Sequence, residues 1–230
     1  MRNLTLLTDL YELTMMYGYF KKGMHKNIVV FDMFFRPPKN GSTYALAAGL
    51  EQVIDYINHL NFDKDSIDYL RSLKLFDEDF LQELVNFRFT GEIYAVPEGT
   101  VVFPYEPIVR VKAPIFEAQL LETALLNIIN HQTLIATKAS KVKYAAGDAE
   151  VMEFGLRRAQ GPDAGIYGAR AAFIGGCSGT SCVLTGQMFG IPVKGTHAHS
   201  WVMSFPDELT AFRVYADVYP HACLLLVDTY

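Results

Sequence analysis

Apolar residues recur with two different periods along this chain, and the period indicates which elements form. Before residue 91 they recur mostly at helical spacing, with Thr8 as the expected cap of the first helix. One stretch, 28–35, is instead rich in β-forming residues and stops at two prolines. The helices predicted in this part of the chain lie at 8–17, 44–60 and 63–87.

From Gly91 the pattern changes to short β segments separated by Pro and Gly, at 92–96, 101–103 and 108–111. A long amphipathic helix is then predicted over 116–146. Its apolar stripe consists of Leu120, Leu121, Ala124, Leu125, Ile128 and Ile129. We therefore divide the chain into an N-terminal α+β domain, residues 1–113, and a second unit, residues 114–230, which begins with the long helix.

After Gly147 predicted strands and helices alternate, which is typical of right-handed βαβ units in a parallel sheet or barrel. Ligands of such folds bind at the carboxyl ends of the strands. About four strands cannot close a barrel, so we expect an α/β barrel that is incomplete at the C-terminus. Either this sequence is the N-terminal part of a longer protein, or the rest of the barrel lies on another chain. The predicted strands are 150–154, 175–177, 192–196 and 222–227, and the predicted helices are 163–173, 181–189 and 206–219.

Charge and composition exclude several classes of protein. The formal net charge is −5 and no run of Lys or Arg occurs, which argues against binding to nucleic acid. No stretch approaches the ~18 apolar residues of a membrane span, and Asp9 and Glu12 interrupt the apolar N-terminus, so no signal peptide is predicted. The three cysteines are irregularly spaced and fit no disulfide framework, which favours a reducing, cytoplasmic location. Cys182 and Cys223 are expected to be buried.

Two histidines, His197 and His199, stand two residues apart after the apolar run 191–193. If that run is a strand, both rings point to the same side at its end. They either hold a metal, as in a His-x-His metal-dependent hydrolase, or one of them acts as a nucleophile or acid–base group. A catalytic zinc needs at least three protein ligands, and no third ligand is evident in the sequence, so we predict no metal-binding residues.

Other polar clusters also follow predicted strands. Arg157 and Arg158 come after 150–154, where guanidinium groups are suited to bind a phosphate or a carboxylate, or else form surface ion pairs. The glycine-rich segment 175–181 opens the next helix, and Thr180 or Ser181 is its expected N-cap. Such a turn can also approach an anion, although the spacing is not that of a Walker A loop.

Taken together, four segments resemble the nicotinate phosphoribosyltransferase family: 8–15 (TDLYELTM), 154–163 (FGLRRAQGPD), 175–186 and 195–201 (GTHAHSW). The resemblance extends from near residue 5 to Tyr230. It implies an N-terminal α+β domain followed by the irregular α/β barrel of a type II phosphoribosyltransferase. The reaction implied, a step in the salvage route of NAD biosynthesis, converts nicotinate and phosphoribosyl pyrophosphate to nicotinate mononucleotide and pyrophosphate. It is coupled to ATP hydrolysis through a phosphohistidine, with Mg²⁺, so such an enzyme is both a glycosyltransferase and a ligase.

The resemblance also implies roles for single residues. His199 matches the family's phosphohistidine, and imidazole is a competent nucleophile, whereas His197 stands at a variable position and receives no role. Phe154 resembles the aromatic residue that stacks on the pyridine ring. Tyr11 resembles a second stacking residue supplied by the partner subunit, which implies a homodimer with a shared active site. Arg157, with Arg158 close by, resembles an arginine that contacts the carboxylate or phosphate of the substrate.

The remaining two site residues concern recognition of the acid. Thr196 resembles a residue that contacts nicotinate, and Ser181 stands where nicotinamide-using relatives carry an aspartate. A neutral serine can donate a hydrogen bond to a carboxylate that an aspartate would repel, so nicotinate is the expected substrate. Because the family continues beyond Leu225–Tyr230, a further hypothesis is an inactive or partial chain that requires a separate C-terminal partner.

Overall fold

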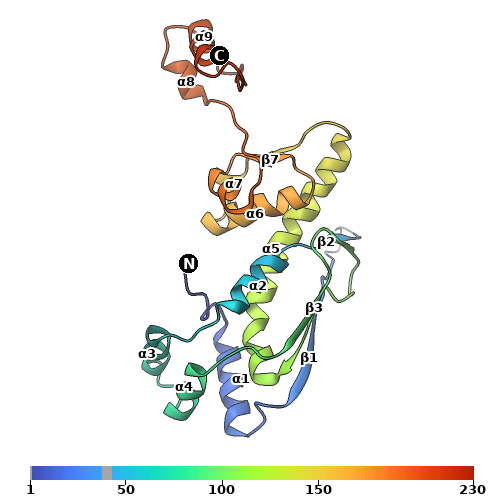
Figure 1. The fold of residues 1–230 in the computed structure, drawn as a ribbon, viewed down its shortest axis with the longest axis vertical. Helices are drawn as coiled ribbons and strands as arrows, with labels where there is room; N and C mark the ends of the chain where they lie inside the picture. The colour runs from blue at the N-terminus through green and yellow to red at the C-terminus, as the bar shows by residue number, and fades with distance from the viewer. Residues whose placement is uncertain (1, 38–42) are drawn as a thin grey trace.

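The computed structural model describes residues 2–37 and 43–230, and one long helix organises them. Helix α5 (Ile115–Ala146) has 32 residues, so it extends about 48 Å through the molecule (Figure 1). The predicted apolar stripe, from Leu120 to Ile129, is buried as expected. The helix ends at Gly147, whose positive φ of 57° suits glycine.

A three-stranded antiparallel sheet packs against the first half of α5. Its order is β1 (Ile28–Met33), β5 (Val109–Pro114) and β3 (Glu92–Ala95). Alternate residues of β5 are buried, whereas Arg110 and Lys112 point outward and pair with carboxylates on the neighbouring strands. Strands β1, β3 and β5 begin within one residue of the predicted β segments, and β5 continues three residues beyond its predicted end.

Four helices and a small two-stranded antiparallel sheet complete the first half of the fold. The prediction of one helix over 44–60 was wrong at its start, because β2 (Ala45–Leu46) pairs there with β4 (Val101–Val102). Gly49, with a φ of 109°, separates that strand from the helix that follows, and a Cβ on Gly49 would lie 3.1 Å from the α5 backbone. The four helices are α1 (Leu10–Lys21), α2 (Leu50–Asn58), α3 (Lys64–Ser72) and α4 (Glu78–Val85). The N-cap of α1 is Asp9 rather than Thr8.

The second half begins with two parallel βα units. Strand β6 (Met152–Glu153) pairs in parallel with β7 (Gly179–Thr180), and Thr180 forms a parallel bridge to Val193. The intervening helices are the short 3₁₀ turn η1 (Leu156–Arg158), α6 (Pro162–Ile174) and α7 (Val183–Phe189).

Two details of the second half differ from the sequence prediction. The strand expected at 175–177 forms a turn instead, because Gly175 and Gly176 accommodate the close approach of α5, and the strand begins at Gly179. The segment 192–196 forms only the single bridge at Val193.

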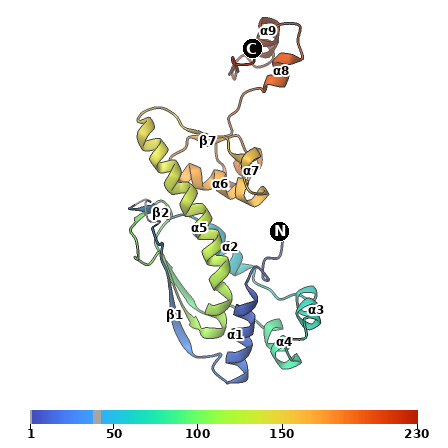
Figure 2. The ribbon, with the colours of Figure 1, turned by 180° about the vertical axis from the view of Figure 1, so that it is seen from behind.

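The C-terminal residues form a separate helical pair. Helix α8 (His199–Met203) and α9 (Glu208–Val218) pack on each other and lie at one end of the molecule, beyond β7 (Figures 1 and 2). The segment 222–227 was predicted as a strand, but it pairs with no other strand among the described residues. The fold is therefore a mixed α/β structure with a short parallel sheet and, within its described parts, no closed barrel.

A polar network joins the first half to the second. The Arg170 guanidinium on α6 donates to both carboxylate oxygens of Glu98, at 2.9 and 2.6 Å, and to buried Gln132 of α5 at 3.2 Å. Glu98 also accepts the backbone N–H of Gly49 at 2.6 Å. Burial alone would raise the pKa of Glu98, but Arg170 and the backbone amides outweigh it and hold that pKa below its usual range.

Candidate functional site

The carboxyl ends of the parallel strands bring two of the predicted site loops together. Ser181 N–H donates to the Glu153 carbonyl at 3.0 Å, so the loop after β6 and the loop after β7 begin side by side. Lys194 N–H donates to the Thr180 carbonyl at 3.0 Å, which places the next segment along the same edge. The expectation that polar clusters would gather at the ends of parallel strands is thus met for these loops.

The first loop presents an aromatic ring and two cations to solvent. Phe154 is 52% exposed, and both Arg157 and Arg158 in η1 are exposed. Neither arginine forms an ion pair with any residue in 2–37 or 43–230. Since each guanidinium has five donors, the two arginines are suited to bind an anion rather than to form ion pairs on the surface.

The second loop differs from the predicted N-cap. Helix α7 has Cys182 as its N-cap residue and no side-chain cap, so capping by Thr180 or Ser181 was a wrong prediction. The buried Thr180 hydroxyl instead accepts the Cys182 N–H within the turn, at 3.0 Å. Cys182 and Cys177 are buried, and burial raises the pKa of Cys177, whereas Cys223 is exposed, contrary to expectation.

His199 lies at the start of α8, away from the end of a strand. Its Nδ1 is 3.3 Å from the Thr229 hydroxyl and its Nε2 is 4.0 Å from Asp228 Oδ1. The side chain is 52% exposed. The Thr196 hydroxyl donates to the Leu224 carbonyl. The last residues of the chain therefore fold back along the segment 196–199.

The two histidines do not stand at the end of a paired strand, which was the condition for both rings to point to the same side. His197 Nε2 accepts the Leu226 N–H at 3.2 Å, and its ring packs edge-on against Tyr215 with centroids 4.8 Å apart. The reason is that strand pairing is limited to the single bridge at Val193 and a helix begins at His199, so the alternation of a strand does not apply to the two rings. In the part of the chain that the structure describes, no group of three His, Cys, Asp or Glu side chains could hold a metal.

Tyr11 lies on α1 and is held by α5. Its hydroxyl donates to Glu122 at 2.8 Å, and that bond, with burial, raises the pKa of Tyr11 to about 12. The next residue, Glu12, is fully buried and accepts the backbone and hydroxyl of Thr123 at 2.9 and 2.6 Å. Burial raises the pKa of Glu12. Tyr11 makes no ring contact with Phe154 of the same chain.

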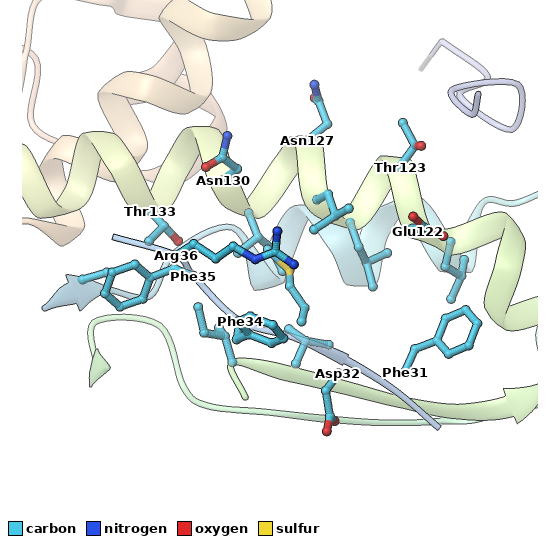
Figure 3. A pocket seen from close by; sticks show the side chains of 18 of the residues that line it. Phe31, Asp32, Phe34, Phe35, Arg36, Glu122, Thr123, Asn127, Asn130 and Thr133 are labelled. Atoms are coloured by element: carbon cyan, nitrogen blue, oxygen red, sulfur yellow. The ribbon is translucent and has the colours of Figure 1, made fainter. Parts of the chain in front are cut away.

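Tyr11 also lines a cavity of about 1170 Å³ between β1 and α5, which the sequence did not reveal. Figure 3 shows Arg36 and Phe34 between the strand and the helix, and the Arg36 guanidinium lies 5.5 Å from the Phe34 ring. Lys138 and Lys141 also line the cavity, as do Asp9 and Glu122, and Glu122 accepts the Tyr11 hydroxyl. No periodic signal identifies these residues, because they come from separate elements.

Comparison with known proteins decides the family. Residues 6–130 match the model of the nicotinate phosphoribosyltransferase (NAPRTase) N-terminal domain, which is more than half of the chain. The chain belongs to the nicotinate phosphoribosyltransferase family. It is 50% identical over 230 residues to nicotinate phosphoribosyltransferase of Bacillus subtilis (strain 168), an alignment that covers 99% of this chain and 46% of that protein. The family expected from the four motifs is therefore confirmed, and the chain spans about half the length of the curated relatives it matches.

Solved structures agree with this family assignment. The crystal structure of human nicotinic acid phosphoribosyltransferase superimposes with a TM-score of 0.88 at 33% identity, over 97% of this chain and 55% of that one. Nicotinate-nucleotide pyrophosphorylase from Pyrococcus furiosus superimposes with a TM-score of 0.76 at 28% identity, over 94% of this chain and 48% of that one. The described residues contain no helix that is long and apolar enough to cross a membrane.

Proposed function

We propose that this chain carries the nicotinate-binding and phosphoryl-accepting part of an ATP-coupled nicotinate phosphoribosyltransferase in the salvage route of NAD biosynthesis. The observation that supports this most is 50% identity to the Bacillus subtilis enzyme of that name across 99% of the chain. The reaction joins nicotinate to phosphoribosyl pyrophosphate and releases pyrophosphate. We place the protein in the reducing cytoplasm, which agrees with the free thiols of Cys177, Cys182 and Cys223.

Nicotinate is proposed to bind at the edge where the loops after β6 and β7 meet. The exposed Phe154 ring offers a face for stacking on the pyridine ring, and Arg157 and Arg158 offer donors to the carboxylate or to a phosphate. Ser181 supplies a neutral donor beside them. Thr196 is proposed to contact nicotinate as well, and its hydroxyl must first leave the Leu224 carbonyl to do so.

His199 is proposed as the residue that accepts the γ-phosphoryl group of ATP. A bond forms between an imidazole nitrogen and phosphorus while the bond to the departing ADP oxygen breaks. Asp228 lies 4.0 Å from Nε2 and can hold the ring in orientation and balance its positive charge. The Asp228 carboxylate and the Thr229 hydroxyl are oxygen donors of the kind that Mg²⁺ accepts alongside phosphate oxygens, so these residues fit that ion.

The shared site proposed for a homodimer fits the position of Tyr11. Within one chain, Tyr11 is bound to α5 through Glu122 and makes no ring contact with Phe154. Because Tyr11 is 45% exposed, it remains accessible to a second copy. In this proposal, Tyr11 of one subunit stacks on the nicotinate held by the Phe154 loop of the other.

A chimera tests the proposed function. This chain replaces the matching residues of the Bacillus subtilis relative, and formation of nicotinate mononucleotide is measured with nicotinate, phosphoribosyl pyrophosphate and ATP. The chain by itself and the chain mixed with the remaining part of that relative are assayed in parallel. We expect product from the chimera. An inactive chimera beside an active Bacillus subtilis enzyme contradicts the proposal, and product from the mixture alone supports a chain that requires a separate partner.

Labelling with γ-labelled ATP tests the role of His199 in the same chimera. His199→Ala removes the only group proposed to carry phosphate, so we expect no label on the protein and no stimulation of synthesis by ATP. His221→Ala is the control, because His221 is exposed and no role is proposed for it, and it should keep the label. Undiminished label on the His199→Ala chimera rules out the assignment.

A further inference from the structure

The side chain of Glu153 joins the two loops that the proposed function uses. Its Oε2 accepts the Thr180 hydroxyl at 2.6 Å, and its Oε1 accepts the backbone N–H of Gly155. Its own carbonyl accepts the Ser181 N–H at 3.0 Å. We call this set of contacts the Glu153 bridge. It ties the beginning of the loop that carries Phe154 to the beginning of the loop that carries Ser181.

Thr180 is a fixed anchor for the bridge. It is fully buried in β7, which pairs in parallel with β6 on one side and bridges to Val193 on the other. Its oxygen already accepts the Cys182 N–H at 3.0 Å, so its single hydroxyl hydrogen is left for Glu153. The carboxylate is therefore held against a part of the sheet that is fixed on both sides.

The glycine at 155 suits the bridge. A Cβ on Gly155 would lie 2.7 Å from Oε1 of Glu153, closer than van der Waals contact permits. Any side chain at this position must displace the carboxylate or the loop. The absence of a side chain thus lets the carboxylate sit beneath the turn from Phe154 into η1.

The geometry also distinguishes a positioning role from a catalytic one. Each carboxylate oxygen of Glu153 already accepts a hydrogen bond from the protein, whereas the exposed groups of the loop are Phe154 and Arg157. A charge-assisted bond to a backbone N–H is among the stronger hydrogen bonds in proteins. The bridge is thus able to hold the loop in one conformation before any substrate binds.

We propose that Glu153 is a positioning residue that sets the Phe154 ring and the Arg157 guanidinium relative to Ser181. The substrate named in this inference rests on the proposed function, but the hydrogen-bonded bridge does not. Loss of the bridge releases the loop and leaves the strands paired. Glu153→Ala should therefore weaken nicotinate binding more than it slows the chemical step.

Amide hydrogen exchange in the 230-residue chain tests the bridge without any activity. In Glu153→Ala the Gly155 amide loses its acceptor, so we expect it to exchange about ten-fold faster or more, in keeping with the strength of bonds to ionised groups. Amides of α5 should keep their rates. Gly155→Ala should speed exchange in the same loop by displacing the carboxylate. Glu150→Gln is the matched control. Glu150 stands three residues before Glu153, and its side chain pairs with Lys194 instead of with the Phe154 or Ser181 loop.

Kinetics of the chimera test the consequence. Glu153→Ala should raise the KM for nicotinate about ten-fold or more, a larger change than in kcat. Glu153→Gln should fall between Ala and the wild type, since its amide oxygen can accept from Gly155 but its NH₂ group cannot accept from Thr180. Glu150→Gln should match the wild type.

Other outcomes separate the two proposals. Unchanged exchange at Gly155, or an unchanged KM, overturns the positioning role. Faster exchange across the whole chain also overturns it, because Glu153 then only stabilises the fold. If Gly155 alone exchanges faster while the wild-type chimera forms no nicotinate mononucleotide, the bridge is supported and the proposed function fails.

Discussion

His197 Nε2 accepts a hydrogen bond from the backbone N–H of Leu226, at 3.2 Å. Leu226 stands two residues before Asp228, which lies beside His199. The first histidine of the motif thus holds the segment that presents a carboxylate to the second. His197, to which the sequence assigned no role, therefore has a structural role: it holds the segment around Leu226.

Removing that acceptor should loosen the C-terminal segment. A lost hydrogen bond of this kind costs about 1 kcal/mol, so His197→Ala should speed exchange of the Leu226 amide about five-fold. His197→Gln places an amide oxygen within reach of the same N–H and should restore part of the protection. His221→Ala is the control, because His221 is exposed and belongs to the same segment. Equal exchange of Leu226 in the wild type and in His197→Ala would show that the contact contributes nothing.

Ser181→Asp tests recognition of the acid. A carboxylate at this position lies beside the Glu153 carbonyl and faces the proposed site of the nicotinate carboxylate, so repulsion should raise the KM for nicotinate about ten-fold or more. Ser181→Ala removes the hydroxyl without adding charge and should have a smaller effect. The measurement is steady-state kinetics of the chimera. A KM that does not respond to the aspartate removes Ser181 from the discrimination between acid and amide.

Tyr11→Ala tests the shared site. An aromatic pair contributes about 0.5–1.5 kcal/mol beyond burial, so loss of the ring should raise the KM for nicotinate several-fold. Tyr11→Phe keeps the ring and loses only the bond to Glu122, and it should stay closer to the wild type. The same KM for all three proteins would argue against stacking by Tyr11.

Elements whose apolar residues repeat over several turns were predictable from the sequence. Elements that depend on pairing with a distant segment of the same chain were not. The long helix was found within one residue of its first residue, because its stripe from Leu120 to Ile129 repeats over several turns. The helix expected from residue 44 begins only at Leu50, since Ala45 and Leu46 pair with a distant strand. Local spacing carries no information about that partner.

The site was predictable to the same extent. Motifs identified the loops that carry Phe154, Arg157 and Ser181, and the parallel pairing of β6 with β7 brings those loops side by side. The bridge through Glu153 was not predicted, because it depends on which oxygen faces which donor across two strands. The helix that begins at His199 was not predicted, since it is short and has no cap signal.

The ion pair between Glu98 and Arg170 should be the costliest polar contact to remove. Their side chains are only 19% and 14% exposed, so Glu98→Ala leaves a largely buried guanidinium without its carboxylate. We expect a loss of about 3 kcal/mol in the free energy of unfolding, measured with urea. Asp32→Ala is the matched control, because its bond to Arg110 lies on the surface and its loss should change stability much less. Equal losses in the two variants would contradict a special role for the buried pair.

The same pair should make stability depend on pH. Because the pKa of Glu98 in the folded chain lies below the ordinary value of 4.5, its stabilising contribution is complete above that value and declines as the pH falls below it. The glutamine in Glu98→Gln cannot titrate. All other carboxyl groups titrate in both proteins, so their contributions cancel in the difference between the two unfolding free energies. The difference in unfolding free energy between wild type and Glu98→Gln should therefore shrink between about pH 5 and pH 3. Urea unfolding at several pH values measures it, and a difference that stays constant over this range is evidence that Glu98 is not ionised against Arg170 in the folded chain.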